Sequence, residues 1–369
     1  MTEATAARTV SPEVRVERLR EAVAEAGLDA YLATSDESIA YLTGFRPLQL
    51  ERLFAVVIRA EDGGAVVVPR LDEGQVGGAP ESLACVSYTA ASDGLAELAG
   101  TLDGARVLGV EEDHLVLARS QALEERGFEL VPAGAVVGRL RARKDEDEIS
   151  RLREACLLVE AALTQMFEEL RPGDVEQLVN ARVEGWLRER GATDAHSLIL
   201  FGEGAANPHG KPGPRELREG DVVCADLSAC LDGYWGDLTR CATVGTPSEW
   251  ARRAWEVVRD AQVAAIQACR AGTPAREIDL AQRQIVEAHP ELGDCLHGAG
   301  HAIGMAIHEP PFLVPRTEAP LEDGMVLTIE PGLYKAGVGG IRLEDDVVVR
   351  PDGPQILSTL PLELIELSV

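Results

Sequence analysis

The sequence predicts an α/β protein of two domains, and three features of its pattern lead to this expectation. Over roughly the first 135 residues, short apolar runs alternate with amphipathic stretches, as in a small α/β domain. Near residue 140 the chain becomes charge-rich and then shows a long helical repeat. Beyond that repeat, pairs of expected helices alternate with expected strands. A chain of 369 residues usually forms two domains, and we place them at residues 1–140 and 141–369.

The first domain is expected to open with a helix at residues 13–26. Apolar side chains recur close to helical spacing from Val14 to Ala26, and Gly27 provides the stop. DAYLAT is expected to be a short strand, and ERLFAVVIRAEDGGAVVVPR a hairpin around its Asp-Gly-Gly turn. The segment TSDESIAYLTGFRP is interpreted as a loop. RVLGVEED is expected as a further strand, with a helix following near residues 115–126.

The second domain is expected to begin with a long helix. Apolar residues recur every three or four positions from Ile149 to Leu170, and Pro172 with Gly173 ends the pattern. Further elements follow in chain order: a helix near 175–190, the strand SLILFG, helices near 248–271 and 274–288, and strands with turns over 324–349. We interpret this order as a rough internal duplication, in which a helix pair and strands occur twice.

Composition excludes several classes of function. The formal charge is −27 and the pI about 4.6, which opposes unassisted binding to nucleic acid or to an anionic membrane. The start MTEATAARTVSP lacks the apolar core of a signal peptide, and no run of eighteen apolar residues occurs. The seven cysteines form no C-x-x-C pair and are expected to be reduced. We therefore expect a cytoplasmic protein that binds neither nucleic acid nor membrane.

Five residues are candidate ligands of metal ions: Asp226, Asp237, His301, Glu330 and Glu344. They lie in four short strings, which are DLSACLDGYWGDLTR, HGAGHAIGMAIHEPP, EPGLY and GGIRLEDD. Four carboxylates and one imidazole suit two divalent ions held side by side, and two such ions can clamp a hydrolytic transition state.

The neighbours of these residues strengthen the interpretation. Asp226 follows an apolar run and Asp237 precedes another, so the two are expected on facing arms of a β-hairpin. Glu330 follows the strand-like MVLTI, and Glu344 precedes DVVV. A carboxylate at the end of a buried strand is costly unless a cation compensates its charge. A thiol ligand from the nearby cysteines 224, 230 or 241 is the minor alternative, because carboxylate sites suit harder ions.

The histidines cluster as well. His297, His301 and His308 fall within twelve residues, among glycines that allow a close approach of the backbone. A further histidine, His209, lies in the Pro- and Gly-bounded loop NPHGKPGP. The alternative is a glycine-rich loop with incidental histidines.

Taken together, these strings resemble the metallopeptidases of the pita-bread fold, in the branch that contains aminopeptidase P and prolidase. The resemblance covers roughly residues 145–365, with the motifs in the expected order. The string RVERLREAVAEAGLDAYLATSDESIAYLTGF resembles the additional N-terminal domain of that branch. The implied fold is a small α/β domain followed by a pita-bread catalytic domain, with a curved antiparallel sheet flanked by helices.

The resemblance also implies roles for the ligands. Asp226 would chelate one ion, His301 and Glu330 would bind the other, and Asp237 and Glu344 would bridge both. A hydroxide activated by the two metals would be the nucleophile. Glu330 would also be the general base that passes a proton to the leaving nitrogen of proline.

The remaining candidates surround the substrate. His209 and His308 match positions that line the pocket and steady the oxyanion, although His308 could instead be structural. His297 could lie beside the ligands or form a wall for the substrate. Arg342 would hold a carboxylate ligand or touch the substrate, and Tyr334 would donate a hydrogen bond or serve in packing.

Two positions depart from the family pattern. Ala302 stands where the family usually has glycine, and Phe312 stands where some prolidases carry an arginine for the free carboxylate of a dipeptide. This chain therefore either accepts longer peptides or takes a cation from elsewhere. Arg46, with Asp36 as its partner, is one candidate for that cation; the alternative is a surface arginine.

The sequence is thus expected to encode a metal-dependent Xaa-Pro dipeptidase that acts on short proline-containing peptides. Aminopeptidase P is the alternative activity. The expected cofactor is two divalent ions per chain, with Mn²⁺ favoured over Co²⁺ or Zn²⁺, and the expected assembly is a homodimer. Creatinase-like chemistry without metals, or a non-enzymatic binding module, would not need the intact set of five ligands.

Overall fold

The structure, a computed structural model, describes residues 10–368. Most of the start for which we expect no signal peptide lies outside this range. The chain divides into two compact units, one ending at Arg141 and the other beginning at Ala142. Within residues 10–368, no helix is both long and apolar enough to cross a membrane.

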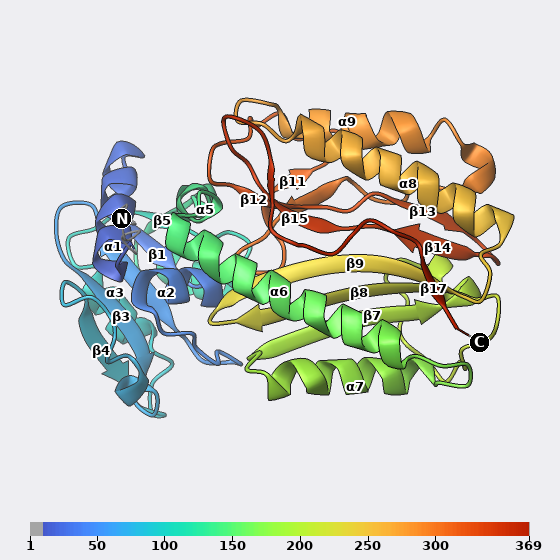
Figure 1. The fold of residues 1–369 in the computed structure, drawn as a ribbon. Helices are drawn as coiled ribbons and strands as arrows, with labels where there is room; N and C mark the ends of the chain where they lie inside the picture. Colours follow the sequence, from blue (N-terminus) through green and yellow to red (C-terminus); the bar gives the residue numbers. More distant parts are fainter. Residues whose placement is uncertain (1–9, 369) are drawn as a thin grey trace, which may run out of the picture. The chain divides into compact units, whose positions relative to one another are not determined.

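The first unit is built on a six-stranded mixed sheet in the order β4-β3-β2-β1-β5-β6, which confirms the expected α/β class (Figure 1). Strand β1 pairs antiparallel with β2 and parallel with β5. The elements are α1 (Pro12–Glu25), β1 (Ala30–Ala33), α2 (Asp36–Thr43), β2 (Ala55–Arg59), β3 (Gly64–Pro69), the 3-10 turn η1 (Glu73–Gln75), β4 (Ala84–Tyr88), α3 (Leu95–Thr101), β5 (Val107–Val110), α4 (Leu117–Glu124), β6 (Glu129–Pro132) and α5 (Gly134–Ala142).

One expectation for this unit is wrong. The segment TSDESIAYLTGFRP is not a loop throughout, because its centre forms α2. The hydroxyl of Ser35 accepts a hydrogen bond from the amide of Ser38 and so caps the helix. Gly44 ends the helix with a left-handed φ of 73°. Both the cap and the stop are visible in the sequence, but the helix of eight residues is too short for a clear apolar repeat.

The second unit repeats a helix pair followed by strands, as expected (Figure 1). Its elements are α6 (Glu146–Glu169), α7 (Glu176–Glu189), β7 (Asp194–Phe201), the 3-10 turn η2 (Gly202–Ala206), β8 (Val222–Leu231), β9 (Tyr234–Val244), α8 (Glu249–Ala268), α9 (Ala275–Val286), the 3-10 turn η3 (Pro290–Leu292), β10 (Gly300–Ala302), β11 (Glu309–Leu313), β12 (Val326–Ile329), β13 (Gly332–Lys335), β14 (Gly339–Arg342), β15 (Asp345–Val348), β16 (Gln355–Ile356) and β17 (Ile365–Leu367).

Hydrogen bonding divides the strands of this unit into three sheets, in the orders β17-β9-β8-β7, β11-β10-β12-β15-β16 and β13-β14. All their pairings are antiparallel except that of β17, which runs parallel to β9. The expected antiparallel arrangement is therefore confirmed, and the C-terminal strand β17 is an addition that the sequence pattern did not predict.

Helices α6 and α7 pack with β7, β8 and β9, while α8 and α9 lie with the other strands (Figure 1). Helix α6 approaches β9 closely because Gly236 has no side chain. A Cβ atom at Gly236 would lie 2.3 Å from the backbone nitrogen of Cys156, a distance that forces the two elements apart.

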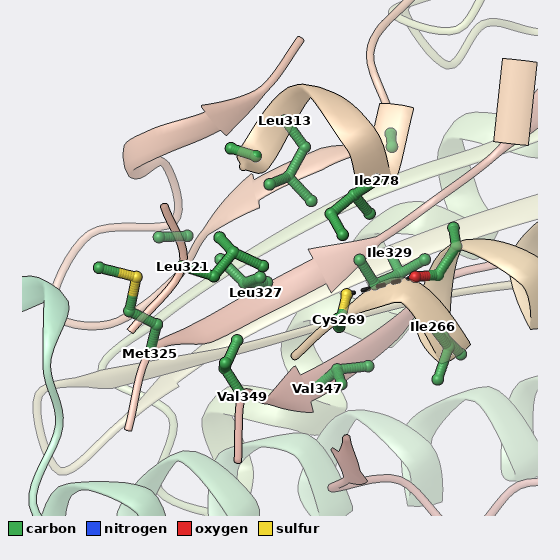
Figure 2. Close-up of a cluster of buried hydrophobic side chains, with 14 of the residues drawn as sticks. Ile266, Cys269, Ile278, Leu313, Leu321, Met325, Leu327, Ile329, Val347 and Val349 are labelled. Atoms are coloured by element: carbon green, nitrogen blue, oxygen red, sulfur yellow. Dashed lines mark hydrogen bonds between the residues drawn. The ribbon is translucent and has the colours of Figure 1, made fainter. Parts of the chain in front are cut away.

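A buried apolar cluster joins α8 and α9 to the strands of the second half (Figure 2). Ile266 and Ile278 come from the two helices, and Leu327, Ile329 and Val347 come from β12 and β15. Each of these strand residues is fully buried, which stabilises the fold by about 1.5–3 kcal/mol per large side chain. The cluster therefore fixes the end of β12, where the candidate ligand Glu330 follows.

Candidate metal centre

The second unit contains a cavity of about 200 Å³ into which the five candidate ligands all project. The other residues that line this cavity come from three segments of the chain: Pro208, His209, His297, Gly298, Gly300, His308, Phe312, Val314 and Arg342. Residues from positions 208 to 344 are thus gathered around one small space.

The first two carboxylates come from the predicted hairpin. Asp226 lies on β8 and Asp237 on β9, and the register pairs Asp226 with Thr239. Since side chains alternate along a strand, Asp237 and Thr239 point to the same face as Asp226. The turn contains Asp232 at φ 49° and Gly233 at φ 83°, two positive values as in the tight turns favoured by hairpins.

The other three candidate ligands come from the second half of the unit. His301 lies in β10, Glu330 directly follows β12, and Glu344 lies between β14 and β15. Gly300 allows β10 to approach β12, because a Cβ there would lie 2.1 Å from the carbonyl oxygen of Thr328. The glycine beside this histidine is therefore a steric requirement of the site, in agreement with the sequence argument.

Three of the candidate ligands are close enough to share one ion. Asp237, His301 and Glu344 are buried, and each offers one ligand atom within 4.8 Å of the other two. Burial and the neighbouring carboxylates raise the pKa of Asp237 and Glu344 well above the ordinary range. In addition, Oδ1 of Asp237 is buried without a hydrogen-bond partner among the described residues. A divalent cation would offset this crowded negative charge and give that oxygen a partner, so the residues present fit a metal.

The ring of His301 is oriented for ligation. Its Nδ1–H donates to the carbonyl oxygen of Ala302 at 3.1 Å, which leaves the lone pair of Nε2 free on the side of Glu330. Nε2 lies 3.3 Å from Oε1 of Glu330. A histidine that binds a metal commonly donates its other ring N–H to a backbone carbonyl, and this hydrogen bond fixes its tautomer.

Glu330 is surrounded by two histidines, an arginine and a hydroxyl donor. Burial alone would raise its pKa, but His301, His297 and Arg342 together lower that pKa. The hydroxyl of Thr328 also donates to Oε1 at 3.2 Å. Glu330 therefore stays ionised, as a ligand or a proton acceptor requires.

Arg342 bonds to the candidate ligand Asp226. Its Nη2 donates to Oδ2 of Asp226, its Nε donates to the hydroxyl of Thr239 at 3.1 Å, and its Nη1 donates to the hydroxyl of Tyr334 at 2.9 Å. The side chain is 5% exposed, and all three nitrogens are engaged. Of the two roles considered from the sequence, the contacts match that of holding a carboxylate.

Tyr334 and His297 extend this chain of hydrogen bonds. The hydroxyl of Tyr334 lies 2.8 Å from Nε2 of His297, and Nδ1 of His297 lies 2.9 Å from the carbonyl oxygen of Gly298. Since the carbonyl must accept from Nδ1–H, the tyrosine donates to Nε2. Burial lowers the pKa of His297, which agrees with a neutral ring. Both of its ring nitrogens are occupied, so the contacts fit a place beside the ligands.

His209 and His308 are exposed residues that line the same cavity. The ring of His308 lies with its centroid 4.0 Å from that of His301. Partial burial and the neighbouring His301 lower the pKa of His308. Phe312, with 42% of its surface exposed, forms an apolar wall of the cavity together with Val314. The extra methyl group of Ala302 is buried in the cluster of Figure 2 and is therefore accommodated.

The sequence interpretation missed two threonines that support the ligands. The hydroxyl of Thr239 donates to Oε2 of Glu344 at 2.6 Å, and that of Thr328 donates to Glu330. Thr239 follows Asp237 by two positions, and Thr328 precedes Glu330 by two. Residues two positions apart on a strand point to the same face, and this spacing was the signal that could have identified both threonines.

The remaining candidates lie elsewhere. Arg46 and Asp36 belong to the first unit, where Nη1 of Arg46 lies 3.4 Å from Oε1 of Glu37. Burial raises the pKa of Asp36. Their action on a substrate stays a prediction.

The cysteines considered as alternative ligands take other places. Cys224 and Cys241 face each other across β8 and β9 in an apolar cluster. Among the described residues, neither these two nor Cys230 belongs to the ligand group or lines the cavity. None of the seven cysteines, all of which lie among the described residues, forms a disulfide, as expected.

Comparison with known proteins agrees with this geometry. Residues 150–351 match metallopeptidase family M24, and residues 15–143 match the creatinase/prolidase N-terminal domain. The chain belongs to metallopeptidase family M24. Its catalytic unit therefore is a pita-bread domain with a divalent-metal site, as the resemblance implied.

This M24 chain is matched over nearly its full length by individual relatives. It is 34% identical to the putative dipeptidase YkvY of Bacillus subtilis over 95% of this chain and 99% of that protein. The Xaa-Pro dipeptidase from Bacillus anthracis superposes with a TM-score of 0.89 at 31% identity, over 97% of this chain and all of that one. The prolidase from Thermococcus sibiricus gives a TM-score of 0.91 at 30% identity, over 98% of this chain and 100% of that one.

Proposed function

We propose that this M24 metallopeptidase hydrolyses the Xaa-Pro bond of dipeptides. The observation that carries the proposal is the cavity in which four carboxylates, His301 and two exposed histidines converge. The similarity to Xaa-Pro dipeptidases and prolidases over nearly the whole chain supports the same substrate class.

The proposed cofactor is two divalent ions, which Asp226, Asp237, His301, Glu330 and Glu344 would hold. When bound, such ions lower the pKa of water and polarise a carbonyl group. We favour Mn²⁺, with Co²⁺ or Zn²⁺ as alternatives, because carboxylate-dominated sites suit hard ions.

The side chains of this chain supply the remaining steps. Glu330 is kept ionised by His301, His297 and Arg342. It accepts a proton from the attacking water and passes it to the leaving nitrogen of proline. The lowered pKa of His308 keeps its ring neutral near pH 7, so that it donates one hydrogen bond to the developing oxyanion together with His209. Arg342 and Tyr334 orient Asp226 and His297 rather than the substrate.

Release of the N-terminal residue from longer peptides, as in aminopeptidase P, is the second candidate. It is favoured by one observation. Among the described residues that line the cavity, Arg342 is the single Arg or Lys, and its nitrogens are all engaged. A free carboxylate would therefore need a cation from outside this lining, for which we propose Arg46.

The other expectations complete the proposal. Residues 1–140 and 141–369 act as separate domains of a cytoplasmic homodimer. Its partners are short proline-containing peptides, with no role for nucleic acid or membrane, given the charge of −27. The intact ligand set argues against a non-enzymatic binding module.

The test is to supply the metal-stripped chain with Mn²⁺ and to compare hydrolysis of Ala-Pro with that of Ala-Pro-Ala. Faster cleavage of Ala-Pro supports the dipeptidase, and faster release of alanine from the tripeptide supports the alternative. Asp237→Asn should abolish either activity, while Asp232→Asn at the exposed hairpin turn should leave it unchanged. Cleavage of neither peptide by a chain that has bound Mn²⁺ contradicts the proposal.

A further inference from the structure

A buried polar cluster lies behind the ligands, and the proposed function does not use it. It consists of Arg240 on β9, Asp345 on β15, Gln262 on α8 and Ser358 near the C-terminus. Arg240 and Asp345 are each 2% exposed, and Gln262 is fully buried. Burying these groups is costly unless their hydrogen bonds are satisfied.

Arg240 connects strand β9 to the segment that carries a ligand. Its Nη1 donates to the carbonyl oxygen of Glu344 at 2.7 Å and to that of Thr239 at 3.0 Å. Its Nη2 donates to Oδ1 of Asp345 at 2.7 Å and to the carbonyl oxygen of Leu360 at 3.2 Å. One guanidinium group thus bonds to the backbone of the ligand Glu344 itself.

Asp345 extends these contacts to a second ligand. Its Oδ2 accepts from Nε2 of Gln262 at 2.9 Å, and the same Nε2 lies 3.4 Å from the carbonyl oxygen of Ile329. Ile329 is the residue before Glu330. The hydroxyl of Ser358 donates to Oδ1 of Asp345. The cluster therefore touches the backbone at Glu344 and next to Glu330.

We propose that Arg240, Asp345 and Gln262 are positioning residues, which fix the distance between the carboxylate ligands contributed by the two halves of the unit. This inference rests on the proposed function, because it assumes that those carboxylates hold divalent metal. Buried ion pairs add little to stability when compared with apolar replacements. Arg240 and Asp345 can nevertheless position the backbone of Glu344, because the hydrogen bonds of Arg240 are directional and apolar packing is not.

The test measures metal binding apart from activity. Arg240→Lys keeps the charge, but a single ammonium group lacks the planar fork that reaches Glu344 and Asp345 together. Isothermal titration of the metal-stripped full chain with Mn²⁺ should show affinity weakened by about 10- to 100-fold, as for other partners of ligands. The visible spectrum of the Co²⁺-loaded variant should change as well, since it reports ligand geometry.

The matched control is Arg215→Lys. Arg215 also forms a two-pronged ion pair, donating to Asp221 at 2.6 and 2.8 Å, within the same unit. Among the described residues, its hydrogen bonds go to Asp221 and to the carbonyl oxygen of Glu216, and none of them reaches the five candidate ligands. This variant should bind Mn²⁺ within about twofold of the parent, even if its thermal unfolding temperature falls.

Each outcome decides the matter. Arg240→Lys with parental Mn²⁺ affinity and Co²⁺ spectrum overturns the inference, even if the variant unfolds at a lower temperature. If Arg240→Lys does not fold, Gln262→Met replaces it, with an expected weakening of about threefold, and parental affinity again overturns the inference. A parent chain that binds none of Mn²⁺, Co²⁺ and Zn²⁺ refutes the proposed function and this inference with it. A parent that binds while all variants bind equally refutes this inference alone.

Discussion

Thr239 and Glu344 lie 105 positions apart in the chain, and the hydroxyl of Thr239 donates to Oε2 of Glu344 at 2.6 Å. The amide of Glu344 in turn donates to the carbonyl oxygen of Thr239 at 3.1 Å. The two halves of the catalytic unit are therefore joined by a pair of hydrogen bonds at a ligand residue. This contact suggests a direct experiment.

Replacing Thr239 by valine should weaken metal binding with little change in shape. Valine has the size of threonine but leaves Glu344 without its hydroxyl partner, and a bond to a charged group contributes about 1.5–3 kcal/mol. We expect Mn²⁺ affinity, measured by calorimetry, to fall by about tenfold or more. Thr239→Ser retains the hydroxyl and should bind nearly as the parent does; equal affinity in Thr239→Val would exclude this role.

Replacing Glu330 by glutamine should reduce kcat strongly and leave the fold unchanged. The amide can neither accept the transferred proton nor offset the charge of a cation, and proton transfer alone contributes about 10²- to 10⁴-fold. Steady-state kinetics with Ala-Pro would measure the loss, and circular dichroism would verify folding. A variant with more than half of the parental kcat would contradict the role given to Glu330.

The stability of the metal-free chain should fall as the pH rises. Burial raises the pKa of Asp237 well above its ordinary value of 3.8, so the folded state keeps a proton that the unfolded state has lost. The contribution of Asp237 to the free energy of unfolding is fully present below about pH 4. It is lost as the pH rises through the pKa that Asp237 has in the folded state. Between about pH 5 and 8, the thermal unfolding temperature of Asp237→Asn should decrease less than that of the parent. An equal decrease in the parent and in Asp237→Asn would refute Asp237 as the source of this pH dependence.

Replacing Arg46 by alanine tests whether the first unit contributes to recognition of a dipeptide. If Arg46 meets the free carboxylate, the KM for Ala-Pro should rise by about tenfold, the value of one charge-assisted hydrogen bond. The KM for Ala-Pro-Ala should change less. Arg52→Ala, at a similarly exposed arginine nearby, is the control. An unchanged KM for Ala-Pro would end the hypothesis.

Replacing Leu327 by alanine should destabilise the catalytic unit without touching a ligand. Leu327 is fully buried in the cluster of Figure 2, and such truncations cost about 2–5 kcal/mol. Urea unfolding of the metal-free chain would measure the difference. A loss below about 1 kcal/mol would mean that the cluster relaxes around the missing atoms.

The sequence by itself determined the longer regular elements and the candidate ligand strings of this protein. The apolar repeat from Ile149 to Leu170 became α6, and the hairpin with Asp226 and Asp237 became β8 and β9. These signals are local, because helical and strand periods are properties of neighbouring residues. Short elements such as the helix α2 and the strand β17 were missed, since eight and three residues carry little periodicity.

Only the tertiary structure decided which side chains support the ligands. The strings suggest that Arg342 holds a carboxylate, but they do not indicate that this carboxylate is Asp226, or that Arg240 bonds to the backbone of Glu344. Those partners are 116 and 104 positions apart. Hydrogen bonds of this kind depend on distances and angles that exist only after the two halves have packed together, and no pattern of neighbouring residues encodes them.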